Sequence, residues 1–192
     1  MLRRCCLDRK LHVSLGFCAL ICVLGWYDLR VCLWFFVALL CHEVGHIFAM
    51  VCCGVTICGV SLRISGAVIQ HGMCTYRQEL ICAAAGPAAS VLLSLAGYRL
   101  CPELSVLSAI LGLVNLLPLY PLDGGRILRG LLLLVLKEET ALHIVKSTTF
   151  VVCCVLMAAA CCITASLQIG IWPIFAVLAI LWRTGCANWS EK

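Results

Sequence analysis

Stretches of about 20 mainly apolar residues, the length that one helix needs to cross a bilayer, recur along this chain. From Val31 to Cys53, for example, the sequence is apolar apart from the motif HEVGH. The whole chain is 64% hydrophobic and 12% charged, whereas soluble domains are about half apolar and a quarter charged. A soluble core of 192 residues cannot bury that much apolar surface. The sequence therefore predicts an integral membrane protein.

The spacing of the apolar segments predicts an all-α polytopic membrane protein with about six transmembrane helices. The expected spans are residues 11–27, 31–53, 78–98, 104–117, 147–167 and 170–184. Residues 127–139 (ILRGLLLLVLKEE) are too few to cross the bilayer alone, so they predict a re-entrant or interfacial helix. We expect one membrane domain over residues 1–192, with no soluble domain after residue 184.

Residues 54–72 (GVTICGVSLRISGAVIQHG) differ from the segments around them. Apolar and polar residues alternate from Val60 to Ser65, and Ser65-Gly66 suits a turn. This pattern predicts a small β-hairpin, which we expect at the cytoplasmic face. Its edge could accept a substrate strand, or the hairpin could be only a small cap on the membrane domain.

The basic residues predict the orientation of the chain. With the N-terminus in the cytoplasm, all but Arg30 and Arg99 of the 14 Lys and Arg residues fall on the cytoplasmic side. Loops on that side are normally enriched in positive charge, so both termini are expected to be cytoplasmic. No basic cluster carries interleaved aromatic residues, which argues against nucleic-acid binding.

The 17 cysteines are scattered through apolar segments, often as adjacent pairs such as Cys52-Cys53. No C-x-x-C spacing occurs, and disulfide frameworks are typical of small secreted domains. We therefore interpret the cysteines as small apolar packing residues rather than as thiolate ligands of zinc.

The motif HEVGH carries the chemistry. His42 and His46 lie four residues apart, so on a helix they share a face and can bind one ion. This is the H-E-x-x-H arrangement of zinc hydrolases, in which zinc lowers the pKa of a water to roughly 7 and the glutamate takes its proton. A chance match is disfavoured because ionisable groups inside a span are costly. His42 lies roughly 18 Å along the helix from Arg30, which predicts a site within the bilayer toward the cytoplasmic side.

A catalytic zinc usually takes a third protein ligand, and Asp123 is the candidate. It lies in NLLPLYPLDGGR, residues 115–126, where Pro118 and Pro121 cannot continue a helix. A broken backbone at membrane depth is tolerated where it lines a cavity, and Asp123-Gly124-Gly125 is expected to form a turn. Taken alone, Asp123 could instead be the N-cap of a helix that begins near Arg126.

Two further residues are expected near the substrate or the transition state. Asn115 could cap a helix end or donate a hydrogen bond to a developing oxyanion, and the sequence leaves both readings open. Gly124, next to Asp123, is the other candidate.

HEVGH, AAAGPAAS at 83–90 and NLLPLYPLDGG at 115–125 together resemble the site-2 protease family of intramembrane zinc metalloproteases. The match is best to the stage IV sporulation branch, whose members process a sporulation sigma-factor precursor, pro-sigma-K. The resemblance implies that His42, His46 and Asp123 hold one zinc ion per chain, that Glu43 is the general base and that Asn115 lies near the transition state. The catalytic core would cover about 31–136.

The chain departs from that family in two places. Ser90 stands nearest the position after the Gly-Pro motif where the family often has Asn. Sporulation members often carry a nucleotide-sensing CBS domain after the last span, and none is expected within residues 1–192.

These observations predict an intramembrane zinc endopeptidase that acts on a membrane-anchored protein within the lipid bilayer. Membrane inhibitor or regulator proteins and self-association are possible partners. One alternative is a zinc-binding scaffold or transporter without peptidase activity, although the spans after residue 147 offer a transporter few ionisable groups. Another is a membrane metalloprotease whose third ligand is a glutamate.

Overall fold

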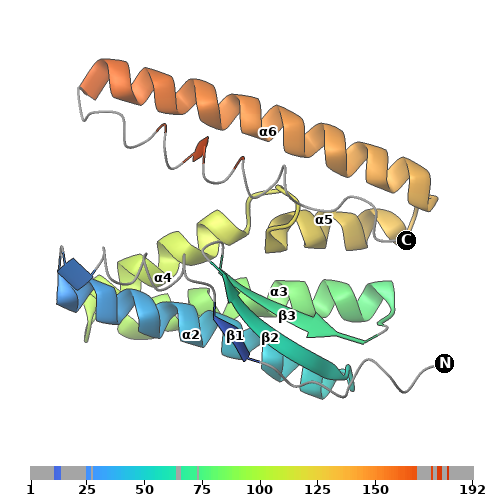
Figure 1. Cartoon of the computed structure of the whole chain (residues 1–192), viewed down its shortest axis with the longest axis horizontal. Helices are drawn as coiled ribbons and strands as arrows, with labels where there is room; N and C mark the ends of the chain where they lie inside the picture. Colours follow the sequence, from blue (N-terminus) through green and yellow to red (C-terminus); the bar gives the residue numbers. More distant parts are fainter. Residues whose placement is uncertain are drawn as a thin grey trace. The chain divides into compact units, whose positions relative to one another are not determined.

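This computed structural model describes residues 11–13, 25–26, 28–63, 66–72, 74–167, 174, 177–178 and 181. The chain divides into two compact units, Met1–Asn115 and Leu116–Lys192. Of the elements that the structure describes, a small sheet and three helices lie in the first unit, and two helices lie in the second after an irregular segment (Figure 1).

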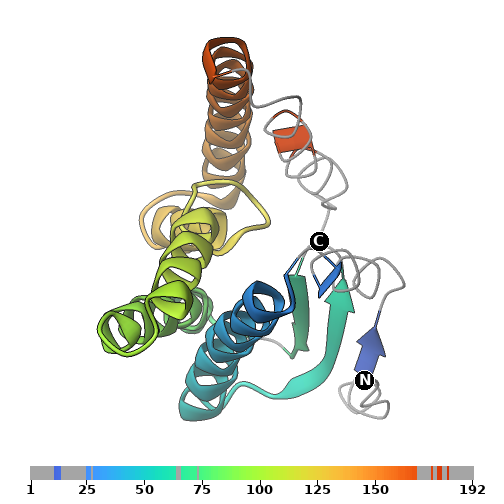
Figure 2. The same cartoon turned by 90° about the vertical axis from the view of Figure 1, so that its left-hand side faces the viewer.

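The helices of the first unit are α2 (Leu29–Cys52), α3 (Tyr76–Gly97) and α4 (Pro102–Asn115). α2 packs against α3 and α4, and α3 packs against α4 (Figure 2). Small residues bring α2 and α3 together: a Cβ added at Gly45 would lie 2.7 Å from both the Ala85 carbonyl oxygen and the Ala89 Cβ. In membranes the hydrophobic effect does not drive helices together, because lipid tails are as apolar as the helix surfaces. Helices there associate through close backbone packing at small residues.

Polar residues fix the ends of these helices. Asp28 caps α2, with its carboxylate accepting a hydrogen bond from the backbone N–H of Arg30 at 2.8 Å. Thr75 and Gln78 form a capping box at the start of α3, which satisfies two backbone N–H groups that the helix itself cannot pair. α2 ends at Cys52 with Cys53 as its C-cap, and Gly54 follows with a φ of 68°, which suits a residue without a side chain.

A three-stranded sheet has the order β1 (Leu11–Val13), β2 (Ile57–Arg63) and β3 (Gly66–His71). β2 pairs antiparallel with β3, with Val60 opposite Ile69, and parallel with β1, with Leu11 opposite Val60. β2 and β3 both lie within residues 54–72; the expected turn residue Ser65 is outside the described residues. The prediction of a helix from residue 11 was wrong at its start, because Leu11–Val13 pair with a strand.

The second unit begins with an irregular segment, followed by α5 (Asp123–Leu133) and α6 (Glu138–Leu167), which pack against each other. Leu119 and Leu122 are buried against Cys153 of α6, so the segment is held by apolar contacts. The backbone N–H of Tyr120 also donates a hydrogen bond to Thr149 Oγ1 at 3.2 Å.

Three predictions about this unit need correction. Asp123, Gly124 and Gly125 form the first turn of α5 rather than a loop turn, and the N-cap is Leu122, so Asp123 is not a cap. The interfacial helix expected at 127–139 begins earlier and stops at Leu133. The span expected at 147–167 is the C-terminal part of a longer helix that begins at Glu138.

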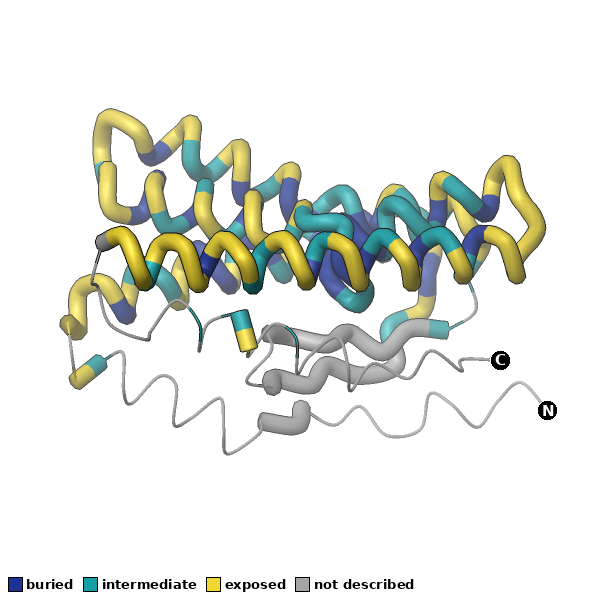
Figure 3. Tube along the Cα trace, turned by 90° about the horizontal axis from the view of Figure 1, so that it is seen from above, coloured by how far each residue is buried: buried dark blue, intermediate teal, exposed yellow. Residues whose placement is uncertain are grey.

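The apolar surface of the helices fits a membrane. Among the described residues, Leu29–Cys52, Tyr76–Gly97 and Glu138–Ser166 are long and apolar enough to span one. Only 33%, 33% and 17% of their most apolar windows are buried inside the protein, and exposed positions run along these helices (Figure 3). Lipid is the environment that would cover such surfaces.

Six spans are not found among the described residues. α4 has 14 residues and would be about 21 Å long, shorter than the roughly 30 Å hydrocarbon core. Most of the expected spans 11–27 and 170–184 lies outside the described residues.

The buried cysteines behave as apolar packing residues. Cys82 packs with Ala49, Met50 and Val55 in one core cluster, and Cys153 packs with Leu119 and Leu122 in another. Cys82 is 3% exposed and Cys153 is 7% exposed. At these positions the thiol fills space in the interior, as a small hydrophobic residue does.

Candidate metal centre

The two histidines of HEVGH lie on one face of α2 and are buried, with exposures of 2% for His42 and 5% for His46. Their rings meet edge to face, with centroids 4.9 Å apart and an interplanar angle of 81°. The two Nε2 atoms are 3.2 Å apart. The i, i+4 spacing therefore aims the same nitrogen of both rings at one point.

The other nitrogen of each ring contacts α3. His42 Nδ1 lies 2.9 Å from Ser90 Oγ, and His46 Nδ1 lies 2.7 Å from the Cys82 carbonyl oxygen. A metal-binding histidine usually donates its second N–H to such a partner, which fixes the tautomer and the orientation of the ring. These contacts suit two imidazoles that offer Nε2 to a metal and carry the proton on Nδ1.

Gly86 of α3 has no side chain, and the two imidazoles occupy the space that a side chain there would fill. A Cβ at this position would overlap the His46 ring and would come within 2.8 Å of His42 Nε2. Gly86 and Pro87 are both buried. The Gly-Pro pair of AAAGPAAS thus marks the place where α3 passes directly beside the imidazoles.

The spacing of the nitrogens fits zinc. Zinc binds histidine nitrogen at about 2.0–2.1 Å and prefers a tetrahedral arrangement, which places two ligand nitrogens about 3.3 Å apart. The observed separation of the two Nε2 atoms is 3.2 Å. Two imidazoles held at this distance can form two corners of such a site.

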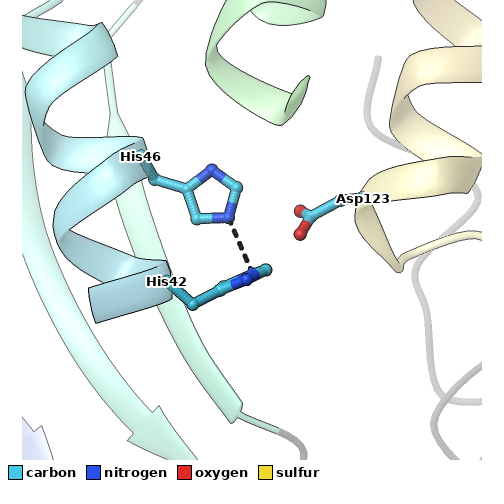
Figure 4. Close-up of side chains that lie close together, drawn as sticks. All are labelled: His42, His46 and Asp123. Carbon is cyan, nitrogen blue, oxygen red and sulfur yellow. Dashed lines mark hydrogen bonds between the residues drawn. The ribbon is translucent and has the colours of Figure 1, made fainter. Parts of the chain in front are cut away.

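Asp123 is buried, with 7% exposure, and is the first residue of α5. His42, His46 and Asp123 form a group that could hold a metal ion, in which one ligand atom from each residue lies within 4.8 Å of the others. Figure 4 draws the side chains of these three residues, with the contact between the two Nε2 atoms dashed. Two nitrogen ligands and one carboxylate oxygen are donors that zinc accepts.

The glycines after Asp123 pack on the irregular segment. A Cβ at Gly124 would overlap the Leu116 carbonyl group, and a Cβ at Gly125 would overlap the backbone of Leu119 and Tyr120. Gly124 thus has a packing role at the start of α5. That role explains why two glycines are found in a helical turn, where they are otherwise unfavourable.

The remaining predicted residues lie on the same elements. Glu43 is half-buried on α2, next to His42 in the chain. Asn115 is the last residue of α4, and its Nδ2 donates a hydrogen bond to the Leu111 carbonyl oxygen at 3.0 Å. In this structure the Asn115 amide therefore bonds to its own helix.

Sequence reasoning missed two groups beside the histidines, the Ser90 hydroxyl and the Cys82 carbonyl. The position of Ser90 after the Gly-Pro motif was noted, but not its contact with His42. A backbone carbonyl has no sequence signal, since every residue carries one.

Three comparisons with known proteins bear on this site. Residues 98–159 match the family model of Peptidase family M50. Zinc metalloprotease MJ0392 of Methanocaldococcus jannaschii is 34% identical over 110 residues, covering 50% of this chain and 32% of that protein. Rip3 of Mycobacterium tuberculosis is 36% identical over 113 residues, covering 50% of this chain and 29% of Rip3. The chain thus spans about a third of the length of these relatives.

The fold has a counterpart in a solved structure, the site-2 protease from Methanocaldococcus jannaschii. The two chains superpose with a TM-score of 0.65 at 22% sequence identity, over 94% of this chain and 92% of that one. At this sequence identity the similarity is evidence for a shared fold and not for a shared function. The chain is therefore similar to Peptidase family M50 over residues 98–159 and to zinc metalloproteases over half of its length, and it shares its fold with a solved site-2 protease.

Proposed function

We propose that this chain is an intramembrane zinc endopeptidase that cleaves a membrane-associated protein. The observation that carries the proposal is the buried histidine pair, with both Nε2 atoms directed at one point and both Nδ1 atoms engaged by α3. The apolar helices and the M50 match support the membrane setting and the reaction class.

In this proposal His42, His46 and Asp123 hold a single zinc ion. When bound, zinc supplies a Lewis acid that lowers the pKa of a water and stabilises negative charge on the carbonyl oxygen of the substrate. The three residues are buried, so they act where bulk water does not compete. Asp123 adds a negative charge to two neutral imidazoles and partly balances the charge of the ion.

Glu43 is proposed as the general base. It takes a proton from the attacking water while the water oxygen bonds to the carbonyl carbon, and it then delivers that proton to the leaving amine as the C–N bond breaks. Its place beside His42 on α2 supports this role, because a side chain one step round the helix lies beside the ion rather than on it.

Asn115 and Gly124 are proposed to lie near the substrate. Asn115 would serve the transition state only after its amide leaves the Leu111 carbonyl and turns to the oxyanion. Gly124 would act indirectly, by letting the Asp123 turn pack on the Leu116 carbonyl.

The substrate must reach the site as an extended segment, because a helix shields its own peptide bonds. We propose that the sheet presents it by strand addition. β2 is paired on both sides, whereas among the described residues β3 pairs only with β2, so the outer edge of β3 is the place for an added strand. As a substrate we propose a membrane-associated protein, and the resemblance to the sporulation branch suggests a sigma-factor precursor as one candidate.

We propose the orientation that the basic residues indicate, with both termini cytoplasmic and the metal within the bilayer toward the cytoplasm. Membrane inhibitors or regulators, and further copies of the chain, remain proposed partners.

The decisive experiment compares wild type with Glu43→Gln. Both proteins would be purified in detergent, their zinc content measured, and each coexpressed with membrane-anchored precursor proteins whose cleavage is followed by gel. Wild type should cleave a precursor, and Glu43→Gln should keep its zinc while cleavage falls by about 100-fold or more, the range that a general base supplies.

Three results would count against parts of this proposal. Cleavage by Glu43→Gln at the wild-type rate would remove Glu43 as the base. Zinc binding by wild type without cleavage of any membrane-anchored precursor would favour the zinc-binding scaffold or transporter. Full zinc occupancy in Asp123→Ala would favour a glutamate as the third ligand.

A further inference from the structure

Ser90 is a fully buried side chain, 0% exposed, in the middle of α3. Its hydroxyl oxygen lies 2.9 Å from His42 Nδ1 on α2. A buried hydroxyl in an apolar helix bundle costs free energy unless it is hydrogen-bonded. This contact is therefore a specific link between α3 and the histidine pair.

The two histidines are held by different acceptors. The Cys82 carbonyl beside His46 can only accept a hydrogen bond, so it requires the proton on Nδ1 of that ring. The Ser90 hydroxyl can either accept or donate. His42 consequently depends on a partner that does not by itself select the tautomer needed for metal binding.

α4 backs Ser90 from the other side. A Cβ added at Gly112 would lie 3.0 Å from Ser90 Cβ and 3.8 Å from Ser90 Oγ. Gly112 is itself buried. The serine is therefore packed between Gly112 of α4 and His42 of α2, which limits how far its hydroxyl can move.

We propose that Ser90 is a positioning residue for the metal centre. Its Oγ accepts the Nδ1–H of His42 and thereby holds the ring in the orientation that directs Nε2 at the ion. The inference rests on the proposed function, since it requires that His42 binds a metal. It assigns to the serine a role in setting zinc affinity through the second nitrogen of the ring.

The test is Ser90→Ala with Ser108→Ala as its matched control. Both serines are 0% exposed, but Ser108 Oγ has no hydrogen-bond partner within the described part of the chain. Both substitutions remove one buried hydroxyl from the same helix pair. Zinc affinity would be measured on the purified proteins in detergent by competition with a chromophoric chelator, and folding by thermal circular dichroism.

Ser90→Ala should bind zinc about 10-fold more weakly, the lower end of what loss of such an outer contact costs. Ser108→Ala should bind zinc as wild type does. A second readout is the visible absorption of the cobalt-loaded proteins, which reports the ligand field. It should change in Ser90→Ala and not in Ser108→Ala.

Equal zinc affinities and identical cobalt spectra in wild type and Ser90→Ala would overturn the inference, and so would equal losses in both variants. Failure of wild type itself to bind zinc or cobalt would instead overturn the proposed function. That failure would be evident before any variant is compared.

Discussion

The histidine pair and the aspartate of the candidate metal centre are built in different ways. His42 and His46 lie on one long helix, and contacts with α3 fix both rings. Asp123 opens a short helix after an irregular segment, and backbone packing around Gly124 and Gly125 fixes that turn. Contacts between helices thus hold the two imidazoles in place, whereas backbone packing around the two glycines holds the turn that carries the Asp123 carboxylate. The two parts should respond differently to a single added methyl group.

The largest effect is expected from Gly86→Ala. The added methyl would overlap the ends of both imidazoles. Only the ring ends must give way, so the free energy of unfolding should fall by about 1 kcal/mol, the lower end of the cost of overpacking, whereas the metal site should be lost. Zinc affinity should drop by more than the 10–100-fold that an outer contact costs, as measured by chelator competition.

Gly97→Ala is the control for that change. Gly97 is a buried glycine on the same helix, but a Cβ there would lie 3.6 Å from its nearest neighbours in Ser105, an ordinary contact. Zinc affinity should stay at the wild-type value. If Gly97→Ala lost as much zinc affinity as Gly86→Ala, any methyl group added to α3 would disturb the site. The contact between Gly86 and the imidazoles would then not explain the effect.

Gly124→Ala should produce the next largest effect, and of a different kind. Alanine normally stabilises a helix over glycine by about 1 kcal/mol. Here the methyl would meet the backbone of Leu116 and Leu117, which cannot rotate away. The expected sign is therefore reversed, with a loss of about 1–3 kcal/mol from overpacking.

Stability and zinc affinity should both fall in Gly124→Ala, as followed by thermal unfolding and chelator competition. A more stable Gly124→Ala protein with unchanged zinc affinity would mean that the turn after Asp123 is not packed as the structure shows.

The smallest effect is expected at Thr149. Its hydroxyl accepts a hydrogen bond from the Tyr120 N–H and ties the irregular segment to α6. Thr149→Val keeps the shape and removes the acceptor, so the unfolding free energy should fall by about 1 kcal/mol. Thr149→Ser keeps the hydroxyl and should lose less. Equal stability of Val and Ser variants would assign the contribution of Thr149 to packing alone.

The sequence predicted the nitrogen half of the site better than the rest. The positions of His42 and His46 follow from helical periodicity, which a single segment displays, and α2 and α3 lie within two residues of their predicted bounds. Asp123 was inferred less directly, from the proline-interrupted segment and from the third ligand that zinc usually takes, because no local rule brings residue 123 to residue 42. The helical start of α5 was missed, because Gly124 and Gly125 predict a turn from the sequence alone. Only their packing against the backbone of the preceding segment explains why they lie in a helix.

The β1 strand was missed for a similar physical reason. Leu11–Val13 open an apolar run that predicts a helix, and only pairing with residues far along the chain makes them a strand. Ser90 carries no local signal for its contact with His42, which depends on how α2 and α3 approach each other.

X-ray absorption at the zinc edge of the purified protein tests the central claim, that His42, His46 and Asp123 bind one zinc ion, most directly. The account predicts two histidine nitrogens and a carboxylate oxygen at about 2.0–2.2 Å, with no sulfur. In Asp123→Ala the oxygen contribution should fall while both imidazoles remain. Sulfur at about 2.3 Å, from the chain's 17 cysteines, or a spectrum unchanged in Asp123→Ala, would contradict it.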